Sequence, residues 1–167
     1  EIAPGSIVSE NELAAELGIS RTPVRDALFE LSKAQIVKIL PQKGSLITKI
    51  DYDLVEEACF IRSVLEKAIV ELACDMATSS DINDLEDILR LQKFYVENPS
   101  PNKLLELDNN FHRQLFKICN KLQAYNFMTS MMIHFDRVRS ISLFSIKDIK
   151  IVNDHYEIVE GIKEKNK

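Results

Sequence analysis

Residues 8–48 read VSENELAAELGISRTPVRDALFELSKAQIVKILPQKGSLIT, and this stretch decides the fold of the first part of the chain. Ser9, followed three residues later by Glu12, forms a capping-box pattern that opens a short helix. Gly18 ends that helix, and Ser20 is placed to cap a second one. The stretch therefore predicts two short helices joined by a tight turn.

The second helix has one apolar side and one polar side. Its predicted buried stripe consists of Val24, Ala27, Leu28 and Leu31. Arg21, Thr22 and Arg25 lie on the outside, near the start of the helix. The following residues 36–50 are rich in β-branched residues around Pro-Gln-Lys-Gly, which predicts two strands and a basic turn. Helix, turn, helix and hairpin is the order of a winged helix-turn-helix.

The position of the two arginines indicates a contact with DNA. The second helix of such a unit enters the major groove with its first residues on the base edges. Arginine can donate two hydrogen bonds to guanine, and a hydroxyl with helix-start N–H groups can hold a phosphate. The alternative is a solvated polar face with no partner. The combination with the hairpin favours DNA binding.

Residues 3–49 resemble the DNA-binding domain of the GntR family of bacterial transcription regulators. The run SRTPVRDAL matches that family's recognition helix, and the glycine-containing turn is similar to its wing. The resemblance implies DNA contacts at Ser20, Arg21, Thr22, Arg25, Lys43 and Gly44. It also implies a helix upstream of the first residue. Because one recognition helix reads too little sequence for specificity, we expect a homodimer on a palindromic operator of duplex DNA.

The composition indicates whether the chain can form a core, where the protein is located and what its cysteines do. With 167 residues, 46% hydrophobic and 28% charged, the chain can bury a core. No run of about 18 apolar residues and no signal-peptide pattern is present, so we expect a cytoplasmic protein. Cys59, Cys74 and Cys119 lie among apolar neighbours and are predicted to be free buried thiols.

The second part of the chain is acidic and helical. Residues 1–50 hold 6 basic and 6 acidic residues, so the net charge of −5 belongs to the rest. From Asp51 onward the periodicity predicts an all-α antiparallel helical bundle. Its five predicted helices cover residues 52–78, 81–97, 102–120, 123–144 and 147–166. We therefore expect a mainly α protein with a winged helix-turn-helix at 1–49 and a bundle at 50–167.

The stretch LLELDNNFHRQLFKICN, residues 104–120, carries a possible metal site. Asp108 and His112 are four residues apart and lie together at the edge of an apolar stripe, where they could bind one divalent ion. His155 could supply a third ligand from another helix. A surface Asp/His pair or a hydrogen-bonded core histidine is the structural alternative. His134 could substitute, but ordinary packing is the preferred interpretation for it.

Three further stretches, at residues 60–78, 107–120 and 154–162, resemble the FCD ligand-binding domain of FadR-type GntR regulators. The resemblance implies a metal bound by Asp108, His112 and His155, with a further ligand beyond the last residue. Imidazole ligation favours zinc or nickel, and the carboxylate would also suit manganese. The resemblance also implies a small carboxylate effector held by Arg62 and Arg139. Salt bridges to acids of neighbouring helices are the alternative role of these arginines.

These observations predict a transcription regulator whose operator affinity is controlled by a small carboxylate at a metal site. A constitutive dimeric DNA binder is the main alternative. A metal-dependent hydrolase is disfavoured, because the sequence has no glycine-rich phosphate loop and no nucleophile paired with a base.

Overall fold

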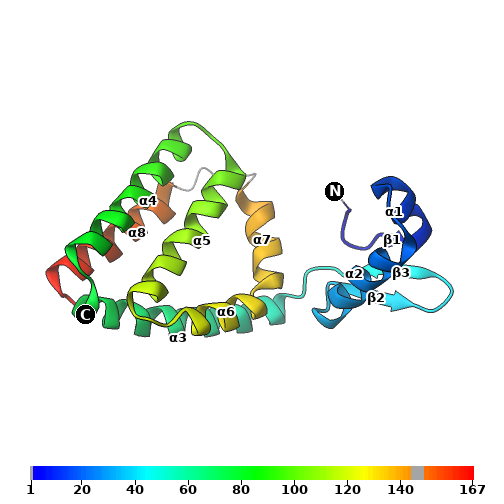
Figure 1. Ribbon diagram of the computed structural model, residues 1–167, viewed down its shortest axis with the longest axis horizontal. Helices are drawn as coiled ribbons and strands as arrows, with labels where there is room; N and C mark the ends of the chain where they lie inside the picture. Colours follow the sequence, from blue (N-terminus) through cyan, green and yellow to red (C-terminus); the bar gives the residue numbers. More distant parts are fainter. Residues whose placement is uncertain (1, 144–148) are drawn as a thin grey trace. The chain divides into compact units, whose positions relative to one another are not determined.

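The computed structural model describes residues 2–143 and 149–167, which fall into two compact units, Glu1–Tyr52 and Asp53–Lys167 (Figure 1). The elements of the first unit are β1 (Ile7–Val8), α1 (Glu10–Leu17), α2 (Arg21–Lys33), β2 (Val37–Leu40) and β3 (Gly44–Ile47). The elements of the second are α3 (Tyr52–Met76), α4 (Ser79–Glu97), α5 (Pro101–Ile118), α6 (Leu122–Met131), α7 (Ile133–Leu143) and α8 (Ile149–Glu164). No helix among the described residues is long and apolar enough to cross a membrane.

The helix-turn-helix is built from the local signals in the sequence. The Ser9 hydroxyl accepts a hydrogen bond from the backbone N–H of Glu12 at 3.1 Å, and the Glu12 carboxylate accepts one from the Ser9 N–H at 3.3 Å. Gly18 ends α1 in the left-handed conformation, with φ of 67°. Ser20 is the N-cap residue of α2, but its side chain makes no capping hydrogen bond. The capping box of α1 and the helix-ending glycine are thus confirmed.

The wing is an antiparallel sheet with the strand order β1-β3-β2. The hairpin of β2 and β3 is the one that the sequence predicts, whereas the two-residue strand β1 was not predicted. Gly44 starts β3 with φ of 104°, and a Cβ atom there would lie 2.6 Å from the carbonyl oxygen of Val8. Glycine at this position therefore allows β1 to approach β3.

The small core of the first unit is formed by Ala14, Val24, Leu28 and Val37. Two residues of the predicted stripe, Ala27 and Leu31, are exposed instead. Within this unit α2 packs against α1 and β2, and these neighbours cover only part of its apolar side.

The second unit has six helices among its described residues, one more than predicted. The predicted helix 123–144 is divided at Met132 into α6 and α7, and residue 144 lies outside the described residues. Met132 and His134 are both buried, although positions two apart on one continuous helix face opposite sides. The break allows both side chains to be buried. The first two residues of the predicted helix 147–166 also lie outside the described residues.

The core of the second unit joins helices that are adjacent in sequence and helices that are distant. Helix α4 packs against both α5 and α8 (Figure 1). The largest fully buried apolar side chains in this core include Leu85, Leu89, Phe111, Leu115, Phe116 and Val159. Cys74 and Cys119 are buried and free, as predicted. The prediction for Cys59 is wrong, because this thiol is exposed: it follows buried Ala58 by one position, about 100° around α3.

Candidate metal centre, ligand cavity and DNA-contact surface

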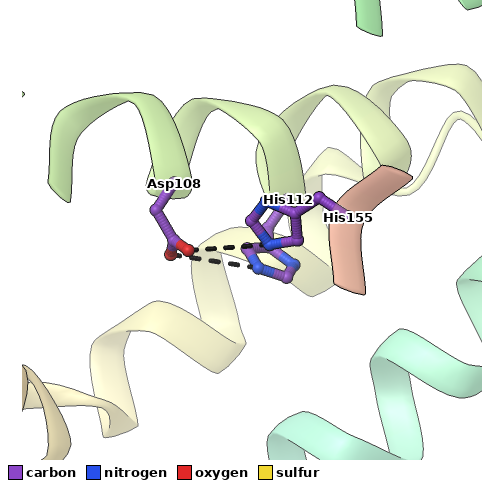
Figure 2. A group of neighbouring side chains, drawn as sticks. All are labelled: Asp108, His112 and His155. Atoms are coloured by element: carbon purple, nitrogen blue, oxygen red, sulfur yellow. Dashed lines mark ion pairs between the residues drawn. The ribbon is translucent and has the colours of Figure 1, made fainter. Parts of the chain in front are cut away.

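The structure brings together the three side chains that the sequence singles out as metal ligands. Asp108 and His112 lie one turn apart on α5, and His155 reaches the same point from α8 (Figure 2). Nε2 of His155 is 3.6 Å from Oδ1 of Asp108, and Nε2 of His112 is 3.9 Å from Oδ2. One potential ligand atom from each residue lies within 4.8 Å of the others, and all three residues are buried. We call these three residues the Asp/His/His cluster.

Neighbouring side chains orient the two imidazoles. Nδ1 of His155 is 2.9 Å from Oε1 of Gln92, and the ring stacks on Phe111 at a centroid distance of 4.1 Å. Nδ1 of His112 is 2.8 Å from Oε1 of Glu66. Both rings thus present Nε2 to Asp108. A metal-binding histidine usually has its second nitrogen held in this way, so the cluster fits a divalent transition metal.

Burial also favours the neutral imidazole that a metal requires. Desolvation, reinforced by His112, lowers the pKa of His155 to about 4, although Asp108 acts in the opposite direction. The ring is therefore neutral at pH 7, with a lone pair on one nitrogen. Burial acts to raise the pKa of Glu66, but the interactions with His112 and Arg62 outweigh it and hold that pKa below its ordinary value. Glu66 is therefore a carboxylate beside His112.

Arg139 of α7 connects the cluster to the neighbouring helices. Its guanidinium donates a hydrogen bond to Oδ2 of Asp108 and another to Oδ1 of Asn109 at 2.9 Å. It also pairs with Asp136, one turn earlier on α7, at 3.2 Å. A salt bridge to an acid of a neighbouring helix, the structural alternative for this arginine, is therefore present.

A cavity of about 270 Å³ adjoins the cluster. It is lined by Arg62, Glu66, Asn109, His112, Tyr125, Met128, Thr129, Met132, Asp136 and Arg139. Arg62 pairs with Glu66 at 2.8 Å, and one of its nitrogens lies 4.0 Å from Oδ2 of Asp108. Both arginines that the sequence singles out thus lie in one cavity wall beside a candidate metal ligand. The cavity offers positive groups and hydrogen-bond donors next to His112.

Gln92 and Glu66 were not predicted from the sequence. Glutamine and glutamate within a helix are ordinarily exposed, so neither residue type draws attention by itself. A signal exists for Gln92, which follows Ile88 and Leu89 by four and three positions and so continues their buried stripe. His134 is buried too, and neither of its ring nitrogens has a hydrogen-bond partner among the described residues. It is not a member of the Asp/His/His cluster.

The predicted DNA-contact residues lie at the start of α2 and at the tip of the wing. Arg21, Thr22 and Arg25 are exposed, as is Ser20 before them. Arg21 pairs with Glu10 of α1 at 3.1 Å, which leaves 65% of the arginine side chain exposed. The exposed Lys43 directly precedes Gly44 at the β2–β3 turn. The basic groups at the start of α2 are thus accessible from the solvent.

Comparison with known proteins identifies the two units. Residues 1–47 match the family model described as bacterial regulatory proteins, gntR family, and residues 57–167 match the FCD domain. The chain is 31% identical to the HTH-type transcriptional repressor RspR of Escherichia coli K12 over 166 residues, which are 99% of this chain and 73% of that protein. It is 27% identical to the gluconate operon transcriptional repressor of Bacillus subtilis, covering 99% of this chain and 70% of that one.

A solved structure shows the same fold. The solved structure of E. coli McbR/YncC superposes with a TM-score of 0.79 at 20% identity, covering 99% of this chain and 79% of that one. The domain matches and the identity with RspR extend over both units described above. The chain belongs to the GntR family of bacterial transcription regulators, and in this chain the winged helix-turn-helix unit precedes an FCD domain.

Proposed function

We propose that this regulator binds a divalent metal ion through Asp108, His112 and His155, and that a small carboxylate bound at the metal controls its affinity for DNA. The observation that carries the proposal is the convergence of three buried ligand groups beside a cavity that contains Arg62 and Arg139. Two imidazoles and one carboxylate suit zinc or nickel, and the carboxylate also suits manganese.

The chemistry of the cavity supports a carboxylate as the effector. When bound, the metal supplies a positive centre that an anionic oxygen can coordinate. Arg62 and Arg139 supply planar donors that match a carboxylate. Without such local positive charge, the acidic residues 51–167 would disfavour an anion. The cavity volume of about 270 Å³ is suited to a small metabolite.

The DNA-binding half of the proposal rests on the accessible residues of the first unit. Arg21 and Arg25 contact bases or phosphates, together with Ser20 and Thr22, and Lys43 and Gly44 approach the duplex from the wing. A homodimer on a palindromic operator provides two such surfaces. The effector shifts operator affinity by its differential affinity for two arrangements of the dimer, for which about 1–3 kcal/mol, or about 5- to 150-fold, is typical.

Metal analysis of matched histidine variants tests the site. His112→Ala removes a ligand of the cluster, whereas His134→Ala removes a buried histidine outside it. We expect wild type and His134→Ala to retain one equivalent of metal after dialysis, and folded His112→Ala to lose it. Equal metal content in all three proteins would contradict the proposed site.

A carboxylate screen by thermal shift on the metal-loaded protein tests the control of DNA binding. The effector found should bind with different affinity in the presence and absence of operator DNA, because coupling between two sites is reciprocal. Equal effector affinity in the two titrations would support the constitutive DNA binder instead.

A further inference from the structure

Gln92 brings a third helix, α4, to the Asp/His/His cluster. Its side chain is fully buried, and its Oε1 lies 2.9 Å from Nδ1 of His155. We propose that Gln92 is a positioning residue, whose oxygen accepts the Nδ1–H of His155 and thereby leaves the lone pair of Nε2 facing Asp108. This inference rests on the proposed metal site and adds a residue that determines whether His155 can act as a ligand.

The tautomer matters because only an unprotonated ring nitrogen can bind a metal. With Oε1 as acceptor, the proton stays on Nδ1 and Nε2 is free to coordinate. With the amide reversed, its NH₂ group would donate to Nδ1, the proton would move to Nε2, and His155 would hydrogen-bond to Asp108 instead. Gln92 therefore selects between a metal ligand and an internal hydrogen bond.

The unsatisfied amide nitrogen shows that Gln92 is not explained by packing. Nε2 of Gln92 is buried and has no hydrogen-bond partner among the described residues. A leucine here would fill a similar volume, as Leu85 and Leu89 do on the same stripe, without an orphaned donor. Packing alone therefore does not account for an amide at this position. A hydrogen bond between its oxygen and His155 accounts for the amide.

The geometry opposite Gln92 points to a cation. In the assigned tautomer, the Nε2 lone pair of His155 faces Oδ1 of Asp108 at 3.6 Å. Two acceptors that face each other repel, and a metal ion between them would convert this repulsion into attraction to both. The stacking of His155 on Phe111, with 18° between the ring planes, restricts the imidazole from turning away. Gln92 and Phe111 together hold His155 in an orientation that suits metal binding rather than a hydrogen bond to Asp108.

Three variants of the full chain separate this role from packing. Gln92→Leu removes the acceptor, and Gln92→Glu keeps an acceptor oxygen. Gln114→Leu is the matched control, since Gln114 is also buried but its amide donates to Asp84 at 3.3 Å. The affinity for Zn²⁺ is measured by competition with a chromophoric chelator, and the ligand field by the absorption spectrum of the Co²⁺-loaded protein.

We expect Gln92→Leu to bind Zn²⁺ about 10- to 100-fold more weakly and to change the Co²⁺ spectrum. Gln92→Glu should stay within a few-fold of wild type, and Gln114→Leu should be unchanged. Equal affinity of Gln92→Leu and wild type would overturn the inference, as would equal losses in Gln92→Leu and Gln92→Glu.

A measurement on wild type alone gives a readout that no folding defect can affect. Nitrogen-15 NMR of the imidazoles in the chelator-treated protein should show His155 protonated at Nδ1. Protonation at Nε2 would overturn the assignment of Gln92 as acceptor. If the wild-type protein binds no metal, both the proposed function and the role of Gln92 are overturned. If it binds metal with an affinity that does not depend on Gln92, only the role of Gln92 is overturned.

Discussion

Arg21 and Lys33 are exposed cations near opposite ends of α2, and each pairs with one glutamate. The distance is 3.1 Å from Arg21 to Glu10 and 2.7 Å from Lys33 to Glu30. Exposed ion pairs of this kind contribute about 0.2–1 kcal/mol to stability. Arg21→Ala and Lys33→Ala should therefore each lower the free energy of unfolding by less than about 1 kcal/mol. The two variants lose the same charge, and we expect both to remain folded.

Their effects on operator binding should differ. If Arg21 contacts a base, its removal should cost about 1–3 kcal/mol per half-site, which weakens binding about 5- to 150-fold for each half-site that the protein contacts. Lys33 lies at the other end of the helix, away from the proposed base contacts, so Lys33→Ala should change Kd by less than about threefold.

The assay is fluorescence anisotropy with an operator fragment that the wild-type protein selects from random duplexes, titrated at several salt concentrations. A base contact leaves the dependence of log K on log salt nearly unchanged, whereas a lost phosphate contact reduces its slope by about 0.9. Equal Kd values for Arg21→Ala and Lys33→Ala would refute the assignment of the start of α2 to the DNA interface.

Three further predictions concern stability. Thr78→Ala should lower the free energy of unfolding, measured by urea denaturation, by about 1 kcal/mol. Hydrogen bonds from Thr78 hold the pKa of Asp81 below its ordinary value of 3.8. The difference in unfolding free energy between the variant and wild type should therefore be complete above pH 3.8 and shrink as the pH falls further. Leu89→Ala should cost about 2–5 kcal/mol in the same assay, against less than about 0.5 kcal/mol for Leu91→Ala, whose side chain is 49% exposed. Gly44→Ala should lower the melting temperature of the first unit, because a Cβ atom there would collide with the backbone of β1; an unchanged melting curve would contradict this account.

The features that the sequence predicts well are those with a local cause. Ser9, Glu12 and Gly18 specify both ends of α1 through hydrogen bonds and backbone conformation within a few residues. Asp108 and His112 are adjacent because any helix places positions four apart on one side. Neither prediction depends on how the helices pack.

The missed features depend on packing between distant segments. The two residues of β1 become a strand only because β3 lies beside them. No glycine or proline marks the break at Met132, which follows from burial on two sides. Gln92 is unremarkable in its own helix, and it gains a role only when α8 brings His155 to it. These features could not be predicted from the sequence, because the residues that cause them are 37 or more positions away or belong to the core as a whole.

The candidate metal ligands and part of the cavity lining come from different helices, and this separation affects how such regulators can diversify. The candidate metal ligands come from α5 and α8, whereas α6 takes part in the site through Tyr125, Met128 and Thr129, which line the cavity. Substitutions on α6 can therefore reshape the cavity without removing an imidazole or carboxylate. Under the proposed function, a lineage can acquire a new signal molecule through a few changes on α6 while it keeps the same metal ligands.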